Sequence, residues 1–150
     1  MRIQFVCLLL VLLSATALSL DVEKRKSIRR QFEDFKTQHI NEDMTADECD
    51  AVIRQRKISF NGKRCKPKNT FIQANIETVK SVCAGKGKPY KTNMTRSTEY
   101  FDIVFCNLTS RAAKNLKCHY EGNNLRRRII IKCKNHLPIH YEDDIDYFEN

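Results

Sequence analysis

The chain opens with an unbroken apolar run, Val6–Leu13, which follows an N-terminal arginine and precedes a stretch of small residues. This order is typical of a secretory signal peptide. The run is too short to span a bilayer comfortably, which argues against a membrane anchor. The pattern predicts a signal peptide at residues 1–20, cut between Ala17 and Leu20. The remainder would be soluble and secreted, and it would have lost Cys7.

Helical spacing of apolar residues recurs three times after this segment. A first helix is expected over residues 27–39, with one face formed by Ile28, Phe32, Phe35 and His39. A second helix follows the Thr45-x-x-Glu48 spacing of a capping box and should end near Arg56. A third helix, over residues 75–83, is apolar on one side and is stopped by the glycines that follow it.

Beyond Tyr90 the sequence becomes rich in residues that favour strands. Strands are expected at residues 101–105, 118–120 and 128–133, and the polar residues 121–124 are predicted to form the loop between the last two. Helices first and antiparallel strands later indicate an α+β fold. By its length the mature chain is one domain, residues 21–150, and it ends in an acidic tail at 142–150.

Six cysteines remain after the signal peptide: Cys49, Cys65, Cys83, Cys106, Cys118 and Cys133. An even number in a small secreted domain indicates disulfides, and none of the spacings is the C-x-x-C of a zinc site or a redox enzyme. Six cysteines allow fifteen pairings, which the sequence alone does not resolve.

The formal net charge of +9 favours polyanionic partners: RNA, heparan-type glycans or anionic bacterial surfaces. Basic residues cluster at 54–57, 86–91 and 126–128. For each cluster a solvated basic surface is the simpler interpretation.

The most informative stretch is Cys65-Lys66-Pro67-Lys68-Asn69-Thr70-Phe71, together with the distant pairs Gln38-His39 and Ile139-His140. A lysine and two histidines brought together by a fold can catalyse phosphoryl transfer without a metal, because the histidine pKa lies near neutrality. This combination resembles the pancreatic-type ribonuclease (ribonuclease A) superfamily over residues 32–140, and within it the three-disulfide, angiogenin-like branch.

The resemblance implies a fold of three N-terminal helices packed on a curved antiparallel sheet. It implies the disulfides Cys49–Cys106, Cys65–Cys118 and Cys83–Cys133, each closing a loop of roughly 50 residues and stabilising by about 4 kcal/mol. It assigns His39 as the base, Lys66 as the cation that stabilises the phosphorane and His140 as the acid. It also assigns the substrate-binding residues Gln38, Asn69, Thr70 and Glu142, with Thr70 recognising a pyrimidine.

Several positions depart from the family pattern. Glu142 replaces an aspartate that orients the second histidine, and Lys134 replaces a purine-contacting glutamate. Phosphate-binding positions of the first helix hold Asp34 and Thr37. The acidic tail includes Tyr147 and Phe148. The resemblance to angiogenin, whose C-terminal segment covers the pyrimidine pocket, implies the same role for this tail, and the alternative is a solvated end. The departures favour an enzyme of low activity.

Other motifs point to no further chemistry. His136 and His140 stand four apart, but Pro138 prevents a helix there, so no metal or other cofactor is expected. Asn93 and Asn107 are in glycosylation sequons, of which Asn93 is the more loop-like.

The expected function is that of a secreted, metal-independent endoribonuclease, monomeric, that cuts RNA 3′ of pyrimidines. It forms a 2′,3′-cyclic phosphate and then hydrolyses it. The alternative is a cationic host-defence or angiogenin-like signalling protein that acts partly without catalysis, through bacterial surfaces or a cell-surface receptor. The resemblance also implies binding by ribonuclease inhibitor if the protein enters a cytosol.

Overall fold

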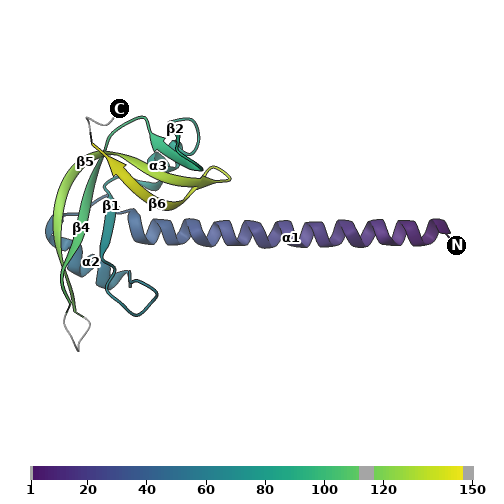
Figure 1. The fold of residues 1–150 in the computed structure, drawn as a ribbon, viewed down its shortest axis with the longest axis horizontal. Coiled ribbons are helices and arrows are strands. Elements are labelled where there is room, and N and C mark those ends of the chain that lie inside the picture. The colour runs from purple at the N-terminus through teal and green to yellow at the C-terminus, as the bar shows by residue number, and fades with distance from the viewer. Residues whose placement is uncertain (1, 112–116, 147–150) are drawn as a thin grey trace.

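A computed structural model of the chain describes residues 2–111 and 117–146. Its first element, α1, is one continuous helix, Arg2–His39. The predicted end at His39 and the predicted buried face, Ile28, Phe32, Phe35 and His39, are confirmed. The predicted start at residue 27 is wrong, because the apolar N-terminal segment is helical as well and is continuous with the rest of α1. That segment is exposed and projects away from the rest of the chain (Figure 1). By length and composition α1 could cross a membrane, a criterion that a signal sequence near the N-terminus also meets.

Two short helices follow. A 3₁₀ turn, η1 (Ala46–Glu48), leads into α2 (Cys49–Gln55), and α3 spans Ile76–Val82. The predicted capping box at Thr45 is wrong, because the Thr45 hydroxyl donates to the Asp47 carboxylate and caps no backbone amide. The boundaries predicted for the third helix are confirmed within a residue, and the Asn75 side chain accepts the Thr78 amide as its N-cap.

Six antiparallel strands make up the sheet (Figure 1), in the order β1-β4-β5-β3-β2 with β6 also paired to β5. Their bounds are β1 Lys68–Ile72, β2 Gly87–Tyr90, β3 Met94–Ser97, β4 Phe101–Arg111, β5 Cys118–Lys134 and β6 Leu137–Ile145. The basic segment at 86–91 contains β2, which forms a hairpin with β3. The predicted α+β fold of three helices packed on an antiparallel sheet is confirmed.

The prediction of a loop at residues 121–124 is wrong, because these residues lie within the central strand β5. These residues continue the strand, because their backbone pairs with β4 from Val104 to Asn107. The polar side chains of Glu121, Asn123 and Asn124 are exposed on this strand. Gly122 is needed there, since a Cβ at this position would come within 2.0 Å of the Ala46 carbonyl oxygen in η1.

The buried hydrophobic side chains form two clusters. One joins α1 and α3 to the sheet and includes Phe35, Val79 and Ile129; the other packs α2 against β1 and β4 and includes Ile53 and Phe71. The predicted disulfides Cys49–Cys106, Cys65–Cys118 and Cys83–Cys133 are all present. The bridges join the start of α2 to β4, and the α2–β1 loop and the end of α3 to β5.

Candidate active site

One cleft of about 440 Å³ collects the side chains that the sequence singled out. It is lined by every predicted catalytic and substrate-binding residue: Gln38, His39, Lys66, Asn69, Thr70, His140 and Glu142. The chain leaving α1 runs beside β1, with the Asn41 amide donating to the Ile72 carbonyl at 3.1 Å. This contact places the C-terminal end of α1 against β1, and β6 closes the other side.

His39 is the last residue of α1 and is only 8% exposed. Its Nδ1 lies 2.8 Å from the Thr70 carbonyl oxygen. A carbonyl can only accept, so Nδ1 carries the proton and the neutral ring presents Nε2 as an acceptor. The ring is held between two aromatic neighbours, Phe35 at 5.3 Å and Tyr141 at 5.2 Å between centroids. The imidazole is therefore fixed in both tautomer and orientation.

The surroundings of His39 favour its neutral form. Burial lowers its pKa to about 3, and the nearby positive charges of Lys66 and His140 act in the same direction. The hydrogen bond to Thr70 opposes this shift. A histidine held neutral at physiological pH is ready to accept a proton.

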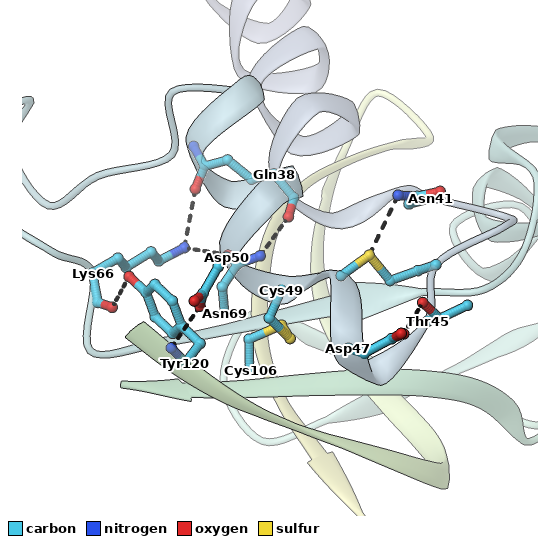
Figure 2. Close-up of a disulfide and its surroundings, with 11 residues drawn as sticks. Gln38, Asn41, Thr45, Asp47, Cys49, Asp50, Lys66, Asn69, Cys106 and Tyr120 are labelled. Atoms are coloured by element: carbon cyan, nitrogen blue, oxygen red, sulfur yellow. Dashed lines mark hydrogen bonds between the residues drawn. A yellow bond between two sulfur atoms is a disulfide. The ribbon is translucent and has the colours of Figure 1, made fainter. Parts of the chain in front are cut away.

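Lys66 is positioned by a small polar network (Figure 2). Its Nζ donates to Asn69 Oδ1 at 2.8 Å and to Gln38 Oε1 at 3.1 Å, and Asn69 Nδ2 donates to the Gln38 carbonyl at 2.8 Å. Partial burial lowers the Lys66 pKa below its ordinary value. Both partners of the ammonium are neutral amides, so its charge is oriented without being neutralised by a carboxylate.

A residue that sequence reasoning did not identify fixes the backbone at this point. The Tyr120 hydroxyl donates to the Lys66 carbonyl at 2.7 Å, and the Tyr120 amide donates to Asp50 at 2.7 Å (Figure 2). Tyr120 follows Cys118, whose disulfide to Cys65 lies next to Lys66. The only sequence signal for this role of Tyr120 is the Cys65–Cys118 pairing, which brings residue 120 close to Lys66.

His140 lies on β6 and is more exposed than His39. Its Nε2 lies 3.0 Å from Glu142 Oε2, so the longer glutamate reaches the ring as the shorter family aspartate is expected to. With Nε2 engaged, Nδ1 is the nitrogen left to act on a substrate.

The threonine predicted to recognise a base already has an internal partner. Thr70 is 5% exposed, and its side chain lies close enough to the Tyr141 hydroxyl to lower the pKa of that group. That hydroxyl donates to Asp144 Oδ2 at 2.9 Å, and Asp144 pairs with Arg127 at 3.6 Å. Burial and the neighbouring carboxylate raise the pKa of Tyr141 well above its ordinary range, and burial raises that of Asp144. Nothing in the sequence pattern indicated this Thr70–Tyr141–Asp144–Arg127 chain.

The beginning of the acidic tail belongs to the sheet. Residues 142–145 continue β6, of which residues 143–145 pair with β5, and Asp146 lies 3.3 Å from Arg127. Tyr147 and Phe148, the residues expected to cover the pyrimidine pocket, lie outside the described residues.

The remaining histidines are apart from the cleft. His119 pairs with Asp50 at 3.2 Å, and His136 lies 3.2 Å from the Cys83 carbonyl. Within residues 2–111 and 117–146 no group of three or more His, Cys, Asp or Glu side chains is arranged to hold a metal ion. The sequon residue Asn93 lies in the β2–β3 turn and Asn107 in β4, both exposed, and their glycosylation stays a prediction.

Comparison with known proteins agrees with this geometry. Residues 30–142 match the family described as pancreatic ribonuclease. The chain is 36% identical to zebrafish (Danio rerio) ribonuclease-like 3 over 93% of its own length and 95% of the relative's. It is 30% identical to mouse (Mus musculus) angiogenin over 63% of each chain. Among solved structures, RNase ZF-3E superposes with a TM-score of 0.73 and 39% identity, covering 79% of this chain and 99% of that one. The chain belongs to the pancreatic ribonuclease family.

Proposed function

We propose that the mature chain is a secreted endoribonuclease that cuts RNA on the 3′ side of pyrimidines without a metal ion. Family membership supports a ribonuclease-type function with RNA as the substrate. The observation that carries the mechanism is the single cleft that holds two histidines and a lysine, each with a different hydrogen-bonding arrangement.

In the first step His39 acts as the base. Its Nε2 takes the proton of a ribose 2′-hydroxyl, and the oxygen forms a bond to the adjacent phosphorus. The Thr70 carbonyl accepts the Nδ1 proton, so the imidazolium that forms keeps its orientation. Because burial and two nearby cations keep His39 neutral, the base is available without prior deprotonation.

The attack adds negative charge to the phosphorus oxygens, and Lys66 is the cation placed to stabilise it. An ammonium already oriented by Gln38 and Asn69 needs little reorganisation when that charge develops. Partial burial strengthens its attraction for the phosphorane relative to a lysine in water.

The bond from phosphorus to the 5′-oxygen then breaks, and protonated His140 supplies the proton that the departing oxygen requires. Glu142, on the opposite ring nitrogen, holds the ring in its orientation. The product is a 2′,3′-cyclic phosphate. Its hydrolysis exchanges the two roles: His140 takes a proton from water and His39 protonates the 2′-oxygen. DNA lacks the 2′-hydroxyl and should not be cut.

Base recognition is assigned to Thr70, whose backbone and hydroxyl can pair with a pyrimidine edge. In this structure the Thr70 side chain lies beside the Tyr141 hydroxyl, so a pyrimidine must compete with that contact. We expect slow turnover for this reason.

The test is cleavage of pyrimidine dinucleotides by the purified, refolded mature chain, in EDTA, with a His140→Ala variant as the control. The expected result is a cyclic phosphate product that persists in EDTA and disappears in the variant. Activity lost on chelation, or retained at full level by the variant, would overturn the proposal.

A further inference from the structure

A second hollow lies apart from the catalytic cleft and shares no lining residue with it. It has a volume of about 760 Å³ and is enclosed by α2, the loop that joins α2 to β1, and the first residues of β5. The Cys65–Cys118 disulfide ties that loop to β5 and forms part of the lining. In Figure 1 this region lies at the lower end of the molecule, below α1, whereas the β2–β3 hairpin lies at the upper end. The hollow has no role in the chemistry proposed above.

The rim of this hollow is strongly positive. Five exposed cationic side chains line it: Arg54, Lys57, Lys63, Arg64 and Lys117. The ion pairs of the described residues involve none of these five. The lining carboxylate, Asp50, is already engaged by His119 and by the Tyr120 amide. Positive charges concentrated around a cavity and lacking carboxylate partners favour an anionic ligand.

Arg56 belongs to the same basic run in the sequence as Arg54 and Lys57, but it does not line the hollow. Its Nη1 donates to the Thr37 carbonyl at 3.0 Å and to the Ile40 carbonyl at 2.6 Å. Arg56 therefore fastens the end of α1, while its neighbours Arg54 and Lys57 line the hollow.

The floor of the hollow is apolar, formed by the buried side chains of Ile53 and Ile58 and by the disulfide. The loop that lines the hollow also carries Phe60, which is not itself a lining residue and is 50% exposed. In the described part of the chain beyond α1, Phe60 is the only exposed large hydrophobic residue. Its loop is ordered by backbone hydrogen bonds in both directions between Phe60 and Arg64, at 2.8 and 3.2 Å. An exposed aromatic side chain held on a tight turn between cations is suited to the boundary between lipid headgroups and acyl chains.

We propose that this hollow and the α2–β1 loop form a docking site for an anionic phospholipid bilayer. The phosphate headgroups contact the five cations, and the Phe60 ring enters the boundary of the acyl region. A sulfated glycan or RNA would satisfy the charges but would leave Phe60 and the apolar floor without a partner. The apolar features therefore favour the lipid surface over those polyanions. The site lies outside the catalytic cleft, so docking does not require catalysis.

The experiment uses the chain without residues 1–20, because that segment would bind lipid by itself. Its removal takes away no buried residue, since the buried positions of α1 begin at Ile28. The chain contains no tryptophan, so Phe60→Trp introduces a single fluorescent reporter at the proposed contact. Vesicles of phosphatidylglycerol with phosphatidylcholine should shift its emission to shorter wavelength, and vesicles of phosphatidylcholine alone should not. An unshifted emission with both vesicles would overturn the proposal.

A second measurement compares two variants of equal charge by vesicle cosedimentation. The triple change of Lys57, Lys63 and Arg64 to Gln should lower binding to the anionic vesicles by on the order of 100-fold. The control changes Lys86, Lys88 and Lys91 to Gln on the β2–β3 hairpin, and its loss should be far smaller. Equal losses in the two variants would show a diffuse charge effect and refute a site. Loss of heparin binding with vesicle binding unchanged would make the hollow a glycan site, and would refute it as well.

Discussion

The Tyr141 hydroxyl restrains the proposed base-recognition residue, and a change of one atom tests this. Tyr141→Phe removes the hydroxyl that lies beside Thr70 and donates to Asp144, but keeps the ring that stacks on His39 at 5.2 Å. The freed Thr70 hydroxyl can then meet a pyrimidine without first leaving an internal partner. We expect the variant to be a better ribonuclease than the natural chain.

The gain is at most that of one neutral hydrogen bond, because the substrate displaces a single polar contact between Thr70 and Tyr141. A neutral hydrogen bond contributes about 0.5–1.5 kcal/mol net. Every 1.4 kcal/mol corresponds to a factor of about ten. Tyr141→Phe should therefore raise kcat/KM on a pyrimidine dinucleotide by about 2- to 10-fold, mainly through KM.

The assay is steady-state cleavage of a pyrimidine dinucleotide, with Tyr120→Phe as the matched control. That variant also loses one tyrosine hydroxyl, but this hydroxyl holds the Lys66 carbonyl, so kcat/KM should fall. The gain from Tyr141→Phe should vanish when Thr70 is replaced by Val. A gain that survives in the Thr70→Val background would refute the reasoning.

Three further outcomes are expected. Asn69→Ala removes a hydrogen bond that orients the Lys66 ammonium. It should lower kcat by roughly 10- to 100-fold, since charged hydrogen bonds contribute about 1.5–3 kcal/mol. A change in KM with kcat unchanged would contradict this. Because the His39 pKa is lowered to about 3 from 6.5, its contribution to stability is complete above pH 6.5 and is lost as pH falls toward 3. The free energy of unfolding, measured with urea, should therefore fall between pH 6.5 and pH 4 by about 3 kcal/mol less in His39→Asn than in the natural chain. Truncation after Ile145 removes Asp146 beside Arg127 and should raise kcat/KM most at low salt; equal values at low and high salt would make the tail inert.

The residues of the cleft could be predicted because the local sequence and the family pattern agree. Gln38-His39 closes an amphipathic helix, and the segment from Cys65 to Phe71 places a lysine and a threonine at the start of a strand. The sequence resemblance thus identified residues that the fold brings together. Their individual catalytic roles stay predictions until the kinetics are measured.

The mistakes have physical causes. Residues 121–124 have the composition of a turn, but strand pairing along β4 overrides it and Gly122 accommodates the backbone of η1. Tyr141, Asp144 and Arg127 interact across two paired strands, and such contacts between separate strands leave no periodic signal in a single sequence. The second hollow likewise depends on a loop and a disulfide that only the folded chain brings together.

The three disulfides overlap in sequence, since each bridge begins before Cys106 and ends at or after it. A protease cut between Cys49 and Cys133 therefore leaves both fragments joined by at least one bridge. His39 precedes this interval and His140 follows it. Residues 40–48 contain no lysine or arginine, so a trypsin-like protease has no site that would release His39 from the bridged region. A protease specific for acidic residues does have such sites, at Glu42, Asp43, Asp47 and Glu48, and a cut there would break the covalent link between His39 and the bridged region.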